Sequence, residues 1–200
     1  MATQTERRAA TQGAIIDAAS RLFGDQGFTA TTVDHIAAAA GIAKGAVYHH
    51  FPNKEAVFEA VFETTSEVLA REVRAAARET PDPLEAMATG NAFYFAACAQ
   101  GPRRQIILRD GPGVLGWERW REVDARHFSR MIPLTLSAAM EAGLMARQPV
   151  EPLATLILGA VTEAAMACAA SNDPVRTAAE TSFALNSILN GLRRTAPKRA

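Results

Sequence analysis

Apolar residues recur along almost the whole chain at the three- and four-residue steps typical of amphipathic helices. Glycine, proline and capping residues divide this pattern into segments. The segments expected to be helical are 11–25, 32–40, 43–50, 54–78, 82–100, 103–110, 117–142, 150–171 and 173–194. No run of β-branched and aromatic residues alternates with polar ones between turn dipeptides, so strands are not indicated. We therefore predict an all-α fold.

Several boundaries of these segments follow from single residues. Thr31 stands three positions before Asp34, a spacing that predicts a capping box at the start of the second helix. The stretch 111–116 contains three glycines and a proline, which predicts a loop or a broken helix. Pro133 lies inside the segment 117–142 and should kink it.

Composition supports the helical prediction and narrows the possible functions. Alanine, the strongest helix former, accounts for 42 of the 200 residues. The 21 basic residues equal the 21 acidic ones, so any nucleic-acid binding must come from locally placed groups rather than from bulk positive charge. Cys98 and Cys168 have no CxxC or Cys/His partner, and we expect both to be core residues.

The start of the chain and its longest uncharged stretch bear on localisation. The first twenty residues are charged and have no apolar region ahead of a cleavage site, so no secretory signal is expected. The stretch 86–102 has no charged residue, yet Gly, Asn and Gln interrupt it, so we expect no membrane helix. The expected location is cytoplasmic.

The short second and third helices meet across Ala40-Gly41-Ile42, a spacing typical of a helix-turn-helix motif. Gly41 supplies the tight turn, and Ile36 and Val47 would pack between the two helices. Helix-Gly-helix pairs also occur in bundles that do not bind DNA, so this geometry alone leaves DNA binding open.

The residues of this motif resemble a known family. The strings Thr31-Thr32-Val33-Asp34-His35-Ile36-Ala37 and Ala40-Gly41-Ile42-Ala43-Lys44-Gly45-Ala46-Val47-Tyr48-His49-His50-Phe51-Pro52-Asn53-Lys54-Glu55 are similar to the N-terminal domain of the TetR (tetracycline-repressor-like) regulators. The resemblance begins at Ile15 and covers about the first 58 residues. It implies a DNA-binding domain at 1–53 and a helical ligand-binding and dimerisation domain at 54–200. The chain departs from the family pattern at Ala43 and Ala46, where Ser or Thr is usual.

The chemistry of the motif suggests how it would contact DNA. Thr31 and Thr32 stand at a helix N-terminus, which favours a phosphate, although simple capping explains Thr31 as well. Small residues beside Lys44 would let the backbone approach the major groove, whereas the bland alternative is a surface turn. The resemblance implies phosphate contacts from Tyr48, His50 and Lys54. The predicted DNA-binding set is Thr31, Thr32, Lys44, Gly45, Ala46, Tyr48, His49, His50 and Lys54.

Polar groups on apolar helix faces in the second domain are candidates for a ligand site. The predicted set is Asn91, Tyr94, Phe95, Cys98, Trp117, Trp120, Asp124, His127 and Met131. Taken singly, each of these residues could equally be ordinary core. Adjacent histidines on a helix point about 100° apart, so His49 and His50 predict no metal site, and no cofactor is predicted.

The last two helices carry small and apolar residues that a homodimeric four-helix bundle would bury. The predicted interface is Leu156, Ala160, Ala164, Ala167, Phe183, Ile188, Leu189 and Leu192, with packing inside the chain as the alternative. No GxSxG, HExxH or phosphate-binding glycine loop is present, so no enzyme is predicted. We predict a repressor that binds an inverted-repeat operator as a homodimer and is released by a small apolar effector. A helical carrier of small molecules without DNA binding is the alternative.

Overall fold

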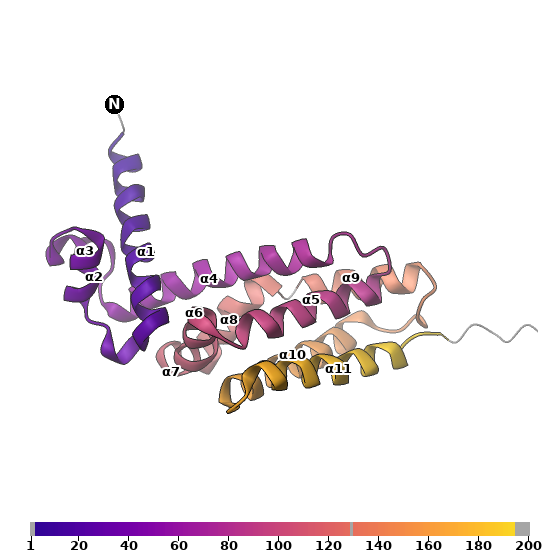
Figure 1. Ribbon diagram of the computed structural model, residues 1–200. Coiled ribbons are helices and arrows are strands. Elements are labelled where there is room, and N and C mark those ends of the chain that lie inside the picture. The colour runs from indigo at the N-terminus through magenta and orange to yellow at the C-terminus, as the bar shows by residue number, and fades with distance from the viewer. Residues whose placement is uncertain (1–2, 129, 195–200) are drawn as a thin grey trace, which may run out of the picture. The chain divides into compact units, whose positions relative to one another are not determined.

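The computed structural model describes residues 3–128 and 130–194, and within these ranges it contains helices and no β-strand (Figure 1). The fold is therefore all-α, as predicted. The helices are α1 (Gln4–Ala30), α2 (Val33–Ala40), α3 (Lys44–His50), α4 (Lys54–Ala77), α5 (Pro83–Cys98), α6 (Gly101–Arg103), the π-helix η1 (Arg104–Asp110), α7 (Gly111–Leu115), α8 (Trp117–Phe128), α9 (Met131–Glu141), α10 (Val150–Ala170) and α11 (Pro174–Gly191).

Contacts between residues divide the chain into two compact units. The first contains the chain up to Glu67 together with Gln100–Val123, and the second contains Val68–Ala99 and the chain from Asp124 onward. Each unit combines separate stretches of the chain, whereas the boundary expected after Asn53 divides the sequence at a single point. The units therefore do not test that boundary, which stays a prediction. Both α4 and α8 run from one unit into the other.

The core of the first unit forms where α1 meets the start of α4. Phe23, Phe28 and Phe58 pack with ring centroids 5.2–5.7 Å apart. Between the first two rings, Gly27 has φ 80°, a conformation that side-chain-bearing residues rarely adopt. This residue is a kink inside α1 rather than its end, because helical residues continue to Ala30.

The segment 100–123 packs against α1 through α6 and η1. Trp120 of α8 is fully buried there, and its indole Nε1 donates to the Ile107 carbonyl at 2.8 Å. A Cβ added to Gly111 would lie 2.8 Å from the Trp120 ring, so only glycine permits this close approach. The glycine-rich stretch predicted as a loop or broken helix is thus the short helix α7 following a π-helix.

In the second unit, α5 packs against α9, α10 and α11, and α10 packs against α9 and α11. The segment predicted as one helix kinked at Pro133 is two helices, α8 and α9, so the position of the break was predicted wrongly. Pro133 is the third residue of α9, where its missing N–H leaves no helical hydrogen bond unmade.

Candidate functional site

Helices α2 and α3 form the predicted helix-turn-helix. Gly41 ends α2 with φ 68°, and its N–H donates to the carbonyls of Ala37 and Ala38. Ile36 of α2 and Val47 of α3 are fully buried and hold the two helices together. The turn and the core between the helices therefore agree with the sequence prediction.

The N-terminus of α3 presents backbone to solvent. Ala43 is the N-cap and makes no side-chain cap hydrogen bond, as expected from the missing Ser or Thr. Lys44 and Gly45 are exposed, and a Cβ added to Gly45 would meet no atom within 4 Å. Free N–H groups beside a lysine suit this end of α3 to an anion or to base edges.

Lys44 is held by an ion pair within the same motif. Its Nζ lies 2.8 Å from Asp34 Oδ2, and this hydrogen bond raises the pKa of the lysine. Both side chains remain about half exposed or more. The ammonium is thus oriented near the start of α3 without being buried, and a competing anion can reach it.

The remaining side chains of α3 differ in exposure. Tyr48 and His49 are exposed, and Ala46 and His50 are half-buried. Burial, followed by the neighbouring His49 and Arg8, lowers the pKa of His50. This shift favours the neutral form of the His50 imidazole.

The prediction that Thr31 caps α2 was wrong, since Thr32 occupies that position. Thr32 Oγ1 accepts from the His35 N–H at 3.1 Å and is exposed. Thr31 is fully buried, and its hydroxyl donates to the Gly27 carbonyl at 2.8 Å. Burial leaves the Thr31 hydroxyl no access to a phosphate, and of the two threonines only Thr32 remains a candidate DNA contact.

Lys54 has a structural role that its position in the sequence did not reveal. Its Nζ donates to the carbonyls of Phe28 and Thr31, each at 2.8 Å, and lies 4.0 Å from the centre of the Phe28 ring. Two of these contacts go to the last turn of α1 and the third to Thr31, which follows it. The ammonium is thus engaged within the first unit, in a half-buried position, and its predicted phosphate contact stays a prediction.

A hydrogen bond joins the last turn of α1 to the segment 100–123. Asp110 Oδ2 accepts from the Phe28 N–H at 2.8 Å.

Trp117 stacks on Trp120 with centroids 5.1 Å apart. Both tryptophans, which were predicted to line a ligand site, lie in the first unit.

The second unit contains an apolar cavity with an empty volume of about 680 Å³, including its solvent-open part. Four residues of the predicted ligand set line it: Asn91, Tyr94, Asp124 and Met131. The other lining residues are Val73, Ala77, Ala86, Met87, Gly90, Phe128, Ile132, Thr135, Leu158, Val161 and Thr162. The cavity thus gathers residues from α4, α5, α8, α9 and α10.

Three further residues of that set lie elsewhere in or near the second unit's core. Phe95 and Cys98 are fully buried, and His127 is half-buried, but none of them lines the cavity. The three- and four-residue spacing of these residues indicates which side of a helix they share. It does not indicate which turns of that helix reach the cavity. Sequence reasoning also missed the contribution of α10, because Leu158 and Thr162 are unremarkable in the sequence.

Helices α10 and α11 carry an exposed apolar surface, which we call the α10–α11 face and define by Leu156, Ala160, Ala167, Phe183 and Ile188. Leu156 is 72% exposed, Phe183 76% and Ile188 59%. Ala164 and Leu192 are half-buried, whereas Leu189 is 1% exposed. Leu189 therefore belongs to the core of its own chain, and its assignment to the interface was wrong.

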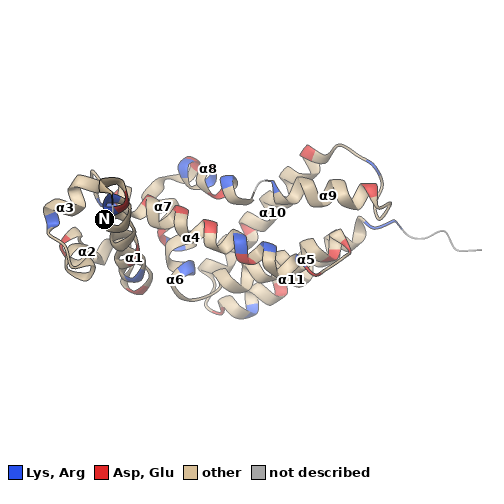
Figure 2. Cartoon of the chain, turned by 90° about the horizontal axis from the view of Figure 1, so that it is seen from above, with Lys and Arg blue, Asp and Glu red and all other residues tan. Residues whose placement is uncertain are grey.

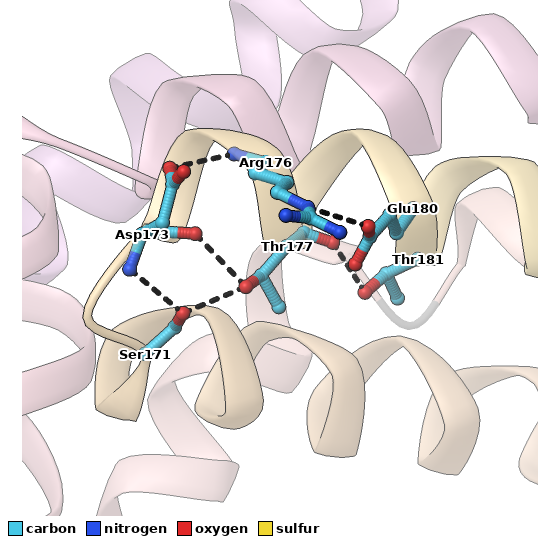
Figure 3. A network of polar contacts seen from close by, with 6 residues as sticks. All are labelled: Ser171, Asp173, Arg176, Thr177, Glu180 and Thr181. Carbon is cyan, nitrogen blue, oxygen red and sulfur yellow. Dashed lines mark hydrogen bonds and ion pairs between the residues drawn. The ribbon is translucent and has the colours of Figure 1, made fainter.

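The turn between these helices is held by a local polar network (Figure 3). Asp173 caps α11 by accepting from the Arg176 N–H, and Thr177 donates to Ser171 Oγ at 2.7 Å. Arg176 pairs with Glu180 one turn later. These hydrogen bonds order the short connection between α10 and α11, and the Arg176–Glu180 pair lies within α11.

By length and composition alone, α10 could cross a membrane, with a mean hydropathy of 1.8 over its most apolar window. Only 28% of that window is buried. The helix also carries Glu151 and Glu163 and packs against three other helices. Its packing against α5, α9 and α11 places α10 in the second unit, and its exposed apolar residues contribute to the α10–α11 face.

The distribution of charged and metal-binding side chains bears on other possible functions. Figure 2 shows acidic and basic residues mixed along α8, whose sequence contains both signs. Across the described parts of the chain, no group of three or more His, Cys, Asp or Glu is arranged to hold a metal ion.

Two family models match the chain. Residues 15–61 match the model for bacterial regulatory proteins of the tetR family, and residues 84–192 match the model for the tetracyclin repressor-like C-terminal domain. The chain belongs to the TetR family of transcriptional regulators. This family consists of regulators rather than enzymes.

Curated relatives match over part of their length. The HTH-type transcriptional regulator AcrR of Shigella flexneri is 37% identical over 110 residues, which are 54% of this chain and 51% of AcrR. The HTH-type transcriptional repressor KstR2 of Rhodococcus jostii is 35% identical over 44% of this chain and 45% of its own. The chain thus spans about half the length of the curated relatives that it matches.

Solved structures match over nearly the whole chain. A TetR-family regulator of Pectobacterium atrosepticum superposes with a TM-score of 0.87 at 26% identity, covering 97% of this chain and 99% of its own. Thermus thermophilus FadR in complex with lauroyl-CoA has a TM-score of 0.69 at 24% identity, covering 94% and 99%. The second likeness shows a shared fold.

Proposed function

We propose that the protein is a repressor that binds an inverted-repeat DNA operator as a homodimer and releases it when a small molecule fills the cavity. The observation that carries this proposal is the exposed N-terminus of α3. Lys44 and Gly45 are solvent-exposed there, on a helix-turn-helix with a packed core. The proposed DNA surface comprises Thr32, Lys44, Gly45, Ala46, Tyr48, His49 and His50.

The homodimer follows from the α10–α11 face. Monomeric proteins rarely leave several large apolar side chains exposed together, and a two-fold axis would bury the same face of both copies. A symmetric dimer presents two recognition helices, which is why an inverted-repeat operator is expected. The relative KstR2 is named as a repressor, which supports repression over activation.

Ligand control follows from the cavity. Family neighbours have been solved with lauroyl-CoA and with resorcinol, so the fold accommodates small molecules. A ligand releases DNA only if it binds the DNA-incompetent conformation more tightly than the competent one. We propose that α4 and α8, which run between the two units, carry this conformational difference.

A gel shift against the DNA upstream of the protein's own gene tests the proposal. Lys44→Ala should weaken operator binding roughly tenfold while weakening random-DNA binding less, because a base contact discriminates between sequences and a phosphate contact does not. Arg78→Ala removes an exposed positive charge from the second unit and serves as the control. Equal loss on both DNAs would show that Lys44 does not read bases. Ligand binding without any gel shift would favour the carrier function.

Asp34→Asn tests the ion pair that holds Lys44. The neutral amide releases the ammonium and removes a negative charge that would face DNA, so binding to any DNA sequence should become a few-fold tighter at low salt. Fluorescence anisotropy with a labelled random duplex measures this change. If Asp34→Asn and the unmodified protein bind the duplex with equal affinity at about 50 mM and at about 200 mM salt, Asp34 does not compete with DNA for Lys44.

A further inference from the structure

The cavity of the second unit has an apolar wall with a few polar side chains, which are those of Asn91, Tyr94, Asp124, Thr135 and Thr162. Three of them already interact with other groups of the protein. Thr135 donates its hydroxyl to the Met131 carbonyl at 2.9 Å. Burial, followed by the nearby Asp124, raises the pKa of Tyr94 well above its ordinary value, and Asp124 has interactions of its own within the chain. We therefore assign none of these three side chains to a ligand.

Asn91 differs from these residues, because its amide nitrogen Nδ2 is buried and has no hydrogen-bond partner among the residues that the structure describes. The residue lies on α5 and lines the cavity beside Gly90. A buried N–H group without an acceptor costs free energy, and nearly all such groups in folded proteins are paired. A molecule in the cavity can provide the acceptor, since Asn91 is part of the wall.

We infer that the effector is an uncharged, mostly apolar compound with a carbonyl oxygen, such as a ketone or an ester, and that this oxygen accepts a hydrogen bond from Asn91 Nδ2. The inference rests on the proposed function in taking this cavity as the effector site. It adds the polar group of the ligand and the residue that recognises it, neither of which the family assignment supplies.

The composition of the wall favours a neutral acceptor over an anion. Among the described lining residues none is Lys, Arg or His, so a carboxylate or phosphate would leave water without a basic side chain to pair with. A carbonyl group loses less on leaving water, and its hydrogen bond to Nδ2 is stronger in apolar surroundings than in water. A hydrocarbon would fill the cavity but leave Nδ2 unpaired. An apolar carbonyl compound therefore matches both the wall and the amide.

Acetophenone and α-methylstyrene isolate the contribution of the carbonyl oxygen, because they differ only in a C=O group that replaces C=CH₂. Methionines labelled with ¹³C in the methyl group report binding by NMR. Met87 and Met131 line the cavity, whereas Met140 and Met145 do not and serve as references. Titration of the full-length protein with each probe should shift the first two signals and give a dissociation constant for each probe in the cavity.

Asn91→Leu removes the donor and keeps the approximate shape of the side chain. The affinity for acetophenone should fall about tenfold, because the carbonyl loses a hydrogen bond from a buried donor. The affinity for α-methylstyrene should stay the same or rise. The ratio of the two dissociation constants is compared between the variant and the unmodified protein, because water solvates the ketone better than the alkene and this difference cancels in the comparison.

Thr135→Val is the matched control, since it removes a polar group from the same wall whose hydrogen bond stays within α9. This variant should leave the ratio unchanged. An unchanged ratio in Asn91→Leu, or no shift of the Met87 and Met131 signals with acetophenone, would overturn the inference.

A measurement on the unmodified protein decides the question if Asn91→Leu does not fold. Acetophenone should move the side-chain NH₂ proton signals of Asn91 downfield, as a new hydrogen bond does, and α-methylstyrene should not. Equal changes with the two probes contradict a hydrogen bond from Nδ2 to the carbonyl oxygen.

The two proposals fail separately. A protein that shifts operator DNA but gives the same probe ratio with and without the Asn91 amide contradicts the carbonyl ligand and leaves the repressor in place. A protein whose probe ratio depends on Asn91 but that shifts no DNA contradicts the proposed function and leaves the ligand assignment standing.

Discussion

Replacing Phe183 by glutamate is expected to convert the protein from a dimer to a monomer. Phe183 is 76% exposed and lies on the α10–α11 face with Leu156 and Ile188. In the proposed dimer each copy of the variant would bury an unpaired carboxylate in an apolar contact, at a cost of several kcal/mol. Light scattering coupled to size-exclusion chromatography should report the mass of one chain, and operator affinity should fall about a hundredfold or more.

Two comparison variants make this test specific. Leu134→Glu changes a leucine on α9 that is 64% exposed and lies outside the proposed interface, so this variant should remain a dimer. Leu189→Glu should instead unfold the second unit, because Leu189 is buried in the chain's own core. A monomeric unmodified protein, or a dimeric Phe183→Glu variant, would refute the α10–α11 face as the dimer interface.

The fold could be predicted from the sequence largely because its determinants are local. Gly41, with its positive φ, and the Asp caps of α5 and α11 act within a few residues of themselves. Errors arose where two local signals compete. Thr31 and Thr32 are both plausible caps. Thr31 is buried against the end of α1, where its hydroxyl donates to the Gly27 carbonyl, and Thr32 caps α2.

The π-helix η1 was not predicted from the sequence, and a side chain from α8 packs against it. The Ile107 carbonyl is taken by the Trp120 indole, and Gly111 allows the ring to approach. Hydrophobic periodicity does not distinguish a π-helical turn from an α-helical one at this length. Similarly, the break between α8 and α9 precedes Pro133 rather than lying at it.

The candidate sites differ in how much of them the sequence reveals. The helix-turn-helix was identified because its core and turn are contiguous in the chain. The cavity was half identified: helical spacing selected Asn91, Tyr94 and Asp124, but packing placed Trp120 in the first unit and brought in residues of α10. Sites assembled from five helices depend on tertiary packing, which no single helix encodes.

Lys54 shows the same limit, and its substitution is expected to destabilise the first unit. Lys54→Met keeps the length of the side chain but leaves the Thr31 carbonyl without this donor and removes the cation from the Phe28 ring. The Phe28 carbonyl also loses the ammonium but keeps the Thr31 N–H as a donor. Charge-assisted hydrogen bonds contribute about 1.5–3 kcal/mol each, or about 3–6 kcal/mol for the two. Because Lys54 is only half-buried, the free energy of unfolding should fall by about 3 kcal/mol, the lower end of this range.

Urea denaturation measures that loss, and Lys44→Met provides the matched control. Lys44 makes an exposed ion pair, so its substitution should leave the urea midpoint close to that of the unmodified protein while weakening operator binding. Lys54→Met should leave the salt dependence of DNA binding unchanged, since its ammonium is held inside the unit. A Lys54→Met variant of normal stability whose salt slope falls by about one would instead identify Lys54 as a phosphate contact, because one fewer counterion would be released.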